Sequence, residues 1–164
     1  MTDALDEMAR QAIDSNKYMT LGTIGPDGRP RVSPVYFTHV GYRDFYWVSS
    51  PDARHSRNVA ERPEVAIVVF DSTAAIGQGR AAYVDAVAAE VPHDELPRRC
   101  AEAFGDTAPG AVAFTPDELS GDAELRLYLA RATAVDVHIR GSDPHFGTGI
   151  DSRRGAEPWA TTRA

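Results

Sequence analysis

Residues 45–70, FYWVSSPDARHSRNVAERPEVAIVVF, decide the fold of this chain. The aromatic and β-branched segment FYWVSS is typical of a strand. Ser50 and Pro51 suit the N-cap and the first position of a helix, which is expected to end near Pro63. The apolar run EVAIVVFD then predicts a second strand, buried on both faces or nearly so. The stretch therefore predicts a short helix held between two strands.

The residues before this stretch predict a helix and a β-hairpin. A helix is expected over residues 3–15, where the apolar side chains repeat at helical spacing. KYMTLGTI and RPRVSPVYFTHV are predicted strands around the turn Pro26-Asp27-Gly28, in which proline presets φ and glycine accepts a positive φ. The apolar face of the helix consists of Leu5, Met8, Ala12 and Ile13.

The second half of the chain continues as strands with one short helix. IGQGRAAYVDAVAAEV predicts a long strand with a bulge at Gly77 and Gly79. PHDELPRRCAEAFG predicts a helix ended by Gly105, and ELRLYLARATAVDVHIR predicts another strand. Residues 1–140 are thus expected to form a single domain, and residues 141–164 a C-terminal tail or set of loops. Some six strands with few helices favour a closed or partly closed antiparallel barrel.

Composition excludes several classes of function. The chain has 164 residues and a formal charge of −7, which argues against nucleic acid as a partner. Its one cysteine, Cys100, is expected to be packed and allows neither an intrachain disulfide nor a cysteine metal cluster. The N-terminal residues do not resemble a signal peptide, and no apolar run approaches the length of a membrane helix. We expect a cytoplasmic protein that does not bind membranes.

The order of three segments resembles a known family. MTLGTIGPDGRPRVSPVYF, FYWVSSPDARHSRNVAERPEVAIVVF and GQGRAAYVDA follow one another as in the pyridoxamine 5'-phosphate oxidase-like superfamily, the FMN-binding split β-barrels. The resemblance runs from about residue 17 to 90 and more weakly to 140. It implies a mainly β protein with a few flanking helices, an antiparallel split barrel of Greek-key type. It also implies a homodimer with two flavins at the subunit interface.

The resemblance also implies a cofactor site. In the family, one strand of the first hairpin contacts the flavin ring, and the end of the next strand with the following helix start holds the phosphate. The family commonly has Arg-Lys at that helix start. Independently, a helix N-terminus attracts anions and an arginine can grip phosphate oxygens with two hydrogen bonds. The predicted cofactor residues are Arg31, Val32, Ser33, Val48, Ser49, Arg54 and His55.

Structural interpretations stand beside these assignments. Arg57 and Glu61 are four residues apart and suit an ordinary surface ion pair. Arg31 on a strand could simply face solvent. Asn58 is expected to be a structural hydrogen-bonding residue, and Gln78 could reach a flavin edge. His138 and His145 make a weak zinc site, so no metal is predicted, and the resemblance brings His138 near the flavin.

The function expected from these features is that of an FMN-dependent oxidoreductase, with a small-molecule substrate and a nicotinamide electron donor. No catalytic side chain can be named, because the flavin itself carries hydride chemistry. Arg153 and Arg154 do not reproduce the terminal motif of true pyridoxamine phosphate oxidases, so vitamin B6 oxidation is not expected. The alternatives are a deazaflavin-dependent reductase and a non-catalytic flavin-binding dimer.

Overall fold

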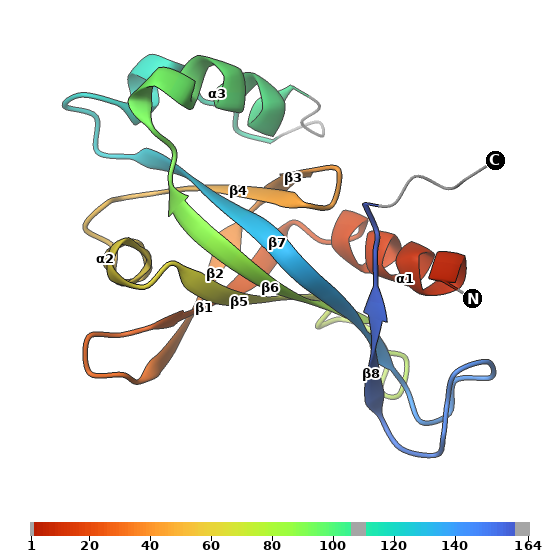
Figure 1. The fold of residues 1–164 in the computed structure, drawn as a ribbon. Coiled ribbons are helices and arrows are strands. Elements are labelled where there is room, and N and C mark those ends of the chain that lie inside the picture. The colour runs from red at the N-terminus through yellow and green to blue at the C-terminus, as the bar shows by residue number, and fades with distance from the viewer. Residues whose placement is uncertain (1, 106–110, 160–164) are drawn as a thin grey trace.

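The structure is a computed structural model that describes residues 2–105 and 111–159, and within them the chain is mainly β (Figure 1). Eight strands, three α-helices and two short 3-10 helices lie in the described part. In chain order they are α1 Thr2–Asp14, β1 Tyr18–Ile24, β2 Pro30–Tyr36, β3 Thr38–Val40, β4 Asp44–Ser49, α2 Arg54–Glu61, β5 Glu64–Phe70, β6 Ala81–Glu90, η1 His93–Glu95, α3 Leu96–Phe104, η2 Pro116–Leu119, β7 Arg126–Ile139 and β8 Ser152–Ala156. None of the described helices combines the length and the apolar character that a membrane crossing needs.

All the strands join one antiparallel sheet in the order β2-β1-β5-β6-β7-β4-β3, with β8 added on β7. The sheet curls so that β2 and β4, which lie near opposite ends of this order, come into contact without forming a ladder. The predicted split-barrel class is therefore confirmed. The barrel stays open between β2 and β4, next to the start of α2.

Strand β4 is buried on both faces, which explains its unbroken aromatic sequence. Phe45 and Trp47 belong to the main core, whereas Tyr46 between them belongs to a second cluster under α3. All three side chains are at most 2% exposed. The expectation of burial on both faces was instead wrong for residues 64–70, because β5 alternates between buried and exposed positions.

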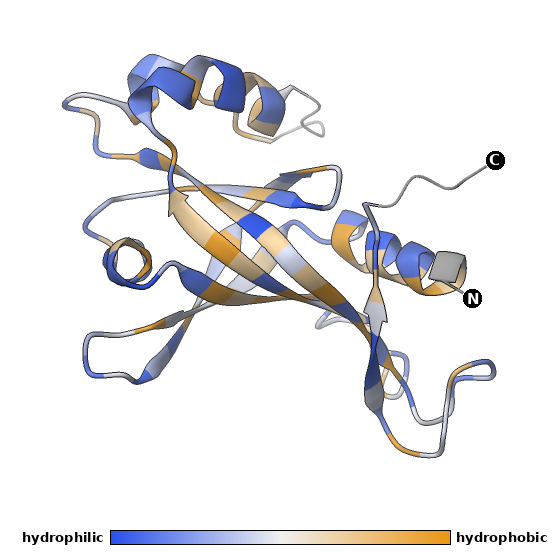
Figure 2. Cartoon of the chain, in the orientation of Figure 1, coloured by the Kyte–Doolittle hydropathy of each residue, from blue (hydrophilic) through white to orange (hydrophobic). Residues whose placement is uncertain are grey.

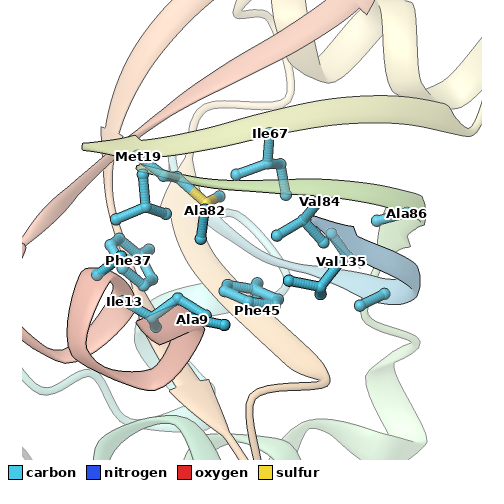
Figure 3. Packing of buried hydrophobic residues seen from close by; sticks show 14 of the residues in the cluster. Ala9, Ile13, Met19, Phe37, Phe45, Ile67, Ala82, Val84, Ala86 and Val135 are labelled. Carbon is cyan, nitrogen blue, oxygen red and sulfur yellow. The ribbon is translucent and has the colours of Figure 1, made fainter. Parts of the chain in front are cut away.

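Helix α1 closes the main core. Its apolar face carries the predicted residues Leu5, Ala12 and Ile13, which are buried, while the opposite face is hydrophilic (Figure 2). Ala9 and Ile13 point toward Phe37 and Phe45 in the packed interior (Figure 3). The helix thus covers the inner face of the curled sheet, as its apolar periodicity indicates.

Two local predictions were wrong at the ends of elements. The predicted N-cap Ser50 lies in a turn, where its carbonyl accepts the Ala53 N–H at 3.1 Å, and α2 begins only at Arg54. The strand predicted from residue 76 begins at Ala81, and Gly77 lies in the preceding turn with a φ of 78°. The register shift of β6 falls at Asp85/Ala86 instead. At residues 50–53 and at Gly77 a local turn delays the start of the helix or strand that the sequence pattern predicts.

The tail expected at residues 141–164 contains a strand. β8 pairs with the last five residues of β7, and Ala156 at its end joins the main core. Beyond it, the Glu157 N–H donates to Asp6 Oδ1 at 2.6 Å and Arg10 Nε donates to the Pro158 carbonyl at 2.9 Å. Described residues of this segment are therefore fixed to both the sheet and α1. The sequence did not predict this five-residue strand, because the segment is rich in turn residues and shows little periodicity.

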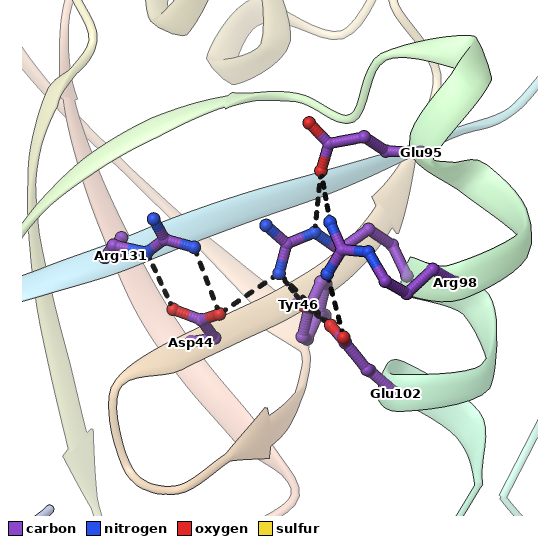
Figure 4. Close-up of polar contacts among 7 residues, drawn as sticks. Asp44, Tyr46, Glu95, Arg98, Glu102 and Arg131 are labelled. Atoms are coloured by element: carbon purple, nitrogen blue, oxygen red, sulfur yellow. Dashed lines mark hydrogen bonds and ion pairs between the residues drawn. The ribbon is translucent and has the colours of Figure 1, made fainter.

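A network of charges holds α3 on the sheet (Figure 4). Arg99 of α3 is buried, and its guanidinium contacts Glu95 at 3.0 Å, Glu102 at 3.1 Å and Asp44 of β4 at 3.2 Å. It also donates to the Tyr46 hydroxyl at 3.0 Å, which in turn donates to Glu102 at 2.8 Å. Burial, together with the Glu102 hydrogen bond, raises the pKa of Tyr46 to about 12, so the hydroxyl keeps its proton.

We predict that Arg99→Met lowers the free energy of unfolding by about 1.5–3 kcal/mol, because the buried Arg99 loses its charge-assisted hydrogen bonds to the partly exposed Glu95, Glu102 and Asp44. Urea denaturation measures this change. Arg98→Met is the matched control, because Arg98 contacts the same Glu95 and Glu102 but its side chain is 56% exposed. An exposed pair contributes about 0–1 kcal/mol. Similar losses in the two variants would contradict a special role for Arg99.

Candidate functional site

The site predicted from sequence forms where β4 passes into α2. Ser49 ends β4, and a tight turn follows in which the Asp52 N–H donates to the Ser50 hydroxyl at 3.2 Å. Helix α2 then begins with Arg54. Its N-cap residue Ala53 has no side chain that could cap the helix, so the first-turn N–H groups keep their capacity to bind an anion.

Helix α2 and the β1–β2 hairpin enclose an arginine-lined hollow of about 410 Å³. We call this hollow the arginine cleft. Arg54 and Arg57 enter it from α2, and Arg31 enters it from β2. Its complete lining is Gly25, Pro26, Asp27, Arg31, Arg54, Arg57, Asn58 and Glu61. Two predicted cofactor residues that are distant in sequence, Arg31 and Arg54, therefore share one cleft.

The arginines of the cleft differ in how far their charge is neutralised. Arg31 forms an ion pair with Asp27 at 3.1 Å. The Arg29 backbone N–H, and secondarily the charge of Arg31, hold the pKa of Asp27 below its usual value. Arg54 and Arg57, in contrast, form no ion pair within 4.0 Å with any described carboxylate, and the expected Arg57–Glu61 pair is not formed. Two uncompensated cations thus face a concave surface.

Ser49 and His55 form one hydrogen-bonded unit. Ser49 Oγ and His55 Nε2 are 2.8 Å apart, and the histidine is half-buried. Burial lowers the pKa of His55, which favours the neutral ring at pH 7. His55 therefore fixes the Ser49 hydroxyl, whereas the charge of the cleft comes from the arginines.

Buried contacts position α2 against the hairpin. Asn58 Nδ2 donates to Thr23 Oγ1 of β1 at 2.9 Å, and both side chains are buried. Arg62, just after the helix, donates to the Gly25 carbonyl at the hairpin turn. Asn58 thus has the structural role expected from sequence, since this contact fixes the width of the arginine cleft.

The remaining predicted cofactor residues lie along the open side of the barrel. Val32 of β2 is 71% exposed, and its neighbour Ser33 is half-buried on the other face of the strand. Val48 is half-buried near the end of β4. Because β2 and β4 contact each other across the opening, the two strands that carry these residues border it.

Three residues considered from sequence lie elsewhere in the same chain. Ser49 pairs with Arg126 at the start of β7, whereas His138 lies twelve residues further along β7, about 40 Å away along an extended strand. Arg153 and Arg154 of β8 pair with that far end of β7. Arg153 lies 3.5 Å from the centre of the Tyr83 ring. Within one chain, none of the three reaches the arginine cleft.

Sequence analysis missed a second hollow, of about 420 Å³, which we call the aromatic cleft. It lies between residues of β1, β2 and β4 on one side and Phe104 with residues 111–114 on the other. Tyr18, Tyr36 and Trp47 come from strands, and Phe104 and Phe114 from the α3 side. Lys17, Thr38, Tyr46, Val48, Ala111, Val112 and Leu125 complete its described lining. The only sequence feature that could have indicated this cleft is the set of aromatic residues near strand ends. In a sequence such residues cannot be told from ordinary core residues.

The sequence and the fold can now be compared with known proteins. A model of the pyridoxamine 5'-phosphate oxidase family matches residues 5–136. The chain belongs to the pyridoxamine 5'-phosphate oxidase family. The match includes all the residues that line the two clefts, but ends before His138 and β8. A comparison with curated protein sequences gives no match.

Solved structures share the fold at low sequence identity. A heme binding protein from Mycobacterium smegmatis aligns with a TM-score of 0.67 and 20% identity over 94% of this chain, which spans 59% of that protein. HutZ, the heme storage protein from Vibrio cholerae, gives 0.60 and 25% identity over 88% of this chain and 98% of its own. An F420 reductase aligns with a TM-score of 0.52 and 23% identity, over 72% of this chain and 87% of the reductase. The family's fold thus occurs in proteins with different ligands.

We predict that acidification destabilises the protein through His55. Burial depresses the pKa of the folded state below the usual value of about 6.5. Above that value the ring is neutral in both states. As the pH falls below it, the unfolded state binds the proton more readily, so the free energy of unfolding decreases. Calorimetric melting between pH 8 and 5 should show this loss.

His55→Gln, which can keep a hydrogen bond to Ser49, should flatten the pH dependence. His93→Gln is the control, because His93 is exposed on η1. If the melting curves of both variants follow the wild-type pH profile, His55 does not cause the loss.

Proposed function

We propose that the protein is an FMN-dependent oxidoreductase whose arginine cleft binds the flavin phosphate. One observation carries the proposal: Arg54 and Arg57 face a concave cleft beside an uncapped helix start, with no described carboxylate within 4.0 Å. Unpaired guanidinium groups bind phosphate oxygens in a planar, two-pronged geometry. The overall charge of −7 makes this local cationic surface a specific feature of the chain.

The other predicted residues suit the rest of such a cofactor. Arg31 is five residues before Tyr36 on β2, so the strand runs about 17 Å from the arginine cleft to the aromatic cleft. An elongated molecule with a phosphate at one end and a planar ring at the other fits that arrangement. Val32, Ser33 and Val48 would then border the ring. When bound, the flavin supplies hydride transfer, and the chain positions it and controls access of water.

Vitamin B6 is not the substrate that we propose, although the family carries that name. A second phosphate-binding group would need cations near the flavin ring. Arg153 and Arg154 do not reproduce the terminal motif of true pyridoxamine phosphate oxidases, and their guanidinium groups already stack over Tyr83 and Phe146. The substrate is therefore proposed to be another small molecule, with a nicotinamide as the electron donor.

A deazaflavin-dependent reductase is the alternative favoured by a specific observation, the similarity to an F420 reductase. The same arginine cleft would hold that phosphate-bearing coenzyme. A non-catalytic flavin-binding protein is the third possibility. Turnover of a nicotinamide donor with an artificial electron acceptor separates it from the two enzymes.

We predict that Arg54→Ala weakens FMN binding roughly 10- to 150-fold, since a charge-assisted hydrogen bond contributes about 1.5–3 kcal/mol. Riboflavin lacks the phosphate, so its affinity should stay nearly unchanged. Quenching of flavin fluorescence during titration measures both. Arg29→Ala is the matched control, because Arg29 is an exposed arginine of the same hairpin that does not line the cleft.

Equal losses for FMN and riboflavin in Arg54→Ala would show that the arginine supports the fold and not the phosphate. Parallel titrations with the deazaflavin F420 and with hemin identify the competing ligands. A protein that binds F420 and not FMN would establish the alternative coenzyme. Binding of hemin alone would exclude both flavin proposals.

We also propose a homodimer, and predict a dimer mass in sedimentation equilibrium at micromolar concentration. Large apolar side chains are exposed on one chain, among them Val32 at 71%, Tyr18 at 62% and Val112 at 60%. Apolar surface of this kind marks interaction sites. Val32→Glu should weaken the dimer, whereas Ile76→Glu, on an exposed turn, should not. A monomer that binds FMN with full affinity would contradict the proposal.

A further inference from the structure

The arginine cleft contains acidic as well as basic side chains. Its lining has three arginines, Arg31, Arg54 and Arg57, and two carboxylates, Asp27 and Glu61, which together leave a net formal charge of +1. Arg31 and Asp27 form an ion pair with each other at 3.1 Å. The charges that face a ligand without a partner are therefore those of Arg54, Arg57 and Glu61.

Glu61 is the acid of the cleft whose charge the fold does not neutralise. It is the last residue of α2, and its side chain is exposed. Among the residues that the structure describes, its carboxylate has no hydrogen bond and no cation within 4.0 Å. Asp27, in contrast, accepts the Arg29 backbone N–H at 3.1 Å in addition to its pair with Arg31. Glu61 thus adds an uncompensated negative charge to the cleft.

The three unpaired charges follow one another along one face of α2. Arg54, Arg57 and Glu61 are spaced three and then four residues apart, which is the spacing of neighbours on one side of a helix. The helical rise places Arg57 about 4.5 Å and Glu61 about 10 Å beyond Arg54 along the axis. The buried hydrogen bond from Asn58 to Thr23 holds this face against the hairpin. The cleft is therefore cationic beside the start of α2 and of mixed sign toward its end.

This order of charges sets how much negative charge a ligand can bring. A phosphate monoester carries about 1.5–2 negative charges at pH 7, which already exceeds the net charge of the lining. One such group beside Arg54 is attracted by two guanidinium groups. A further anionic group near Arg57 would lie within about one helical turn of Glu61 and would be repelled by it.

We propose that Glu61 is a specificity-determining residue, which makes the arginine cleft favour a ligand with one phosphate over a ligand with a second anionic group beyond it. The proposal rests on the proposed function, since it places a coenzyme phosphate in this cleft. FMN carries one phosphate, whereas FAD joins that phosphate to another and F420 continues into an acidic tail. Glu61 thus favours FMN over both, by charge repulsion and without contact to the reacting atoms.

Glu61→Gln tests the proposal, because it keeps the shape of the side chain and removes its charge. Calorimetric titrations of the full chain with FMN and with FAD give the two affinities. At about 0.01 M ionic strength the variant should bind FAD about 3- to 5-fold more tightly than the wild type does, and FMN at most about 2-fold more tightly. At about 1 M ionic strength both gains should vanish, because exposed charges are then screened within about 3 Å.

Two controls separate this effect from other causes. Glu64→Gln is the matched variant, because Glu64 is an exposed glutamate at the start of β5 that does not line the cleft. It should leave the ratio of the two affinities unchanged. Phosphate and pyrophosphate probe the cleft without a flavin, and Glu61→Gln should strengthen pyrophosphate binding about 3- to 5-fold and phosphate binding at most about 2-fold.

The contrary results are distinct. The proposal is overturned by an unchanged ratio of FMN to FAD affinity in Glu61→Gln, by an equal change in Glu64→Gln, or by a change that persists at high salt. A wild-type protein that binds FAD more tightly than FMN would overturn it as well. If the protein binds neither flavin, the proposed function fails, and the phosphate and pyrophosphate titrations decide the inference alone. A preference for phosphate that depends on Glu61 would keep it, and no such preference would overturn it.

Discussion

The register of β7 is the constraint on which the rest of the structure depends. Residues 128–137 of β7 pair with β6 along one edge, and residues 126–131 and 135–139 pair with β4 and β8 along the other. A shift of one residue would turn every side chain of β7 to the opposite face. The pairing of Ser49 with Arg126 therefore fixes where β4 ends, and with it where α2 begins. The arginine cleft is placed by a strand that contributes no residue to its lining.

The same strand separates the chain into two ends. The start of β7 lies beside the turn into α2, and its last residues carry β8. A residue such as His138 can approach a flavin in this cleft only from another copy of the chain. The family resemblance implied both a flavin near His138 and a homodimer. Because His138 and the arginine cleft lie at opposite ends of β7 in one chain, a flavin near His138 requires the homodimer.

Long patterns in the sequence predicted the fold, and short-range contacts account for the errors. The periodicity of α1 and the alternation of β7 are repeated over many residues, so tertiary packing reinforces them. The start of α2 was misplaced because the turn closed by the Ser50 carbonyl displaces the helix by three residues. The order of the family-like segments predicted two residues of the arginine cleft, Arg31 and Arg54. No sequence feature predicted the aromatic cleft, since nothing in the sequence distinguishes Trp47 in its wall from a wholly internal tryptophan.

The surroundings of each arginine indicate whether its charge stabilises the fold or is available to a ligand. Arg99 is surrounded by Glu95, Asp44 and Glu102, so its charge is fully used in holding α3 on the sheet. Arg54 and Arg57 have the same side chain, but neither forms an ion pair within 4.0 Å with a described carboxylate, although Asp27 and Glu61 also line the cleft. Folding thus provides a partner for one arginine and leaves two cations on a concave surface. A charge that the fold does not neutralise is available to an anion from solution, which is the physical basis for placing the cofactor phosphate there.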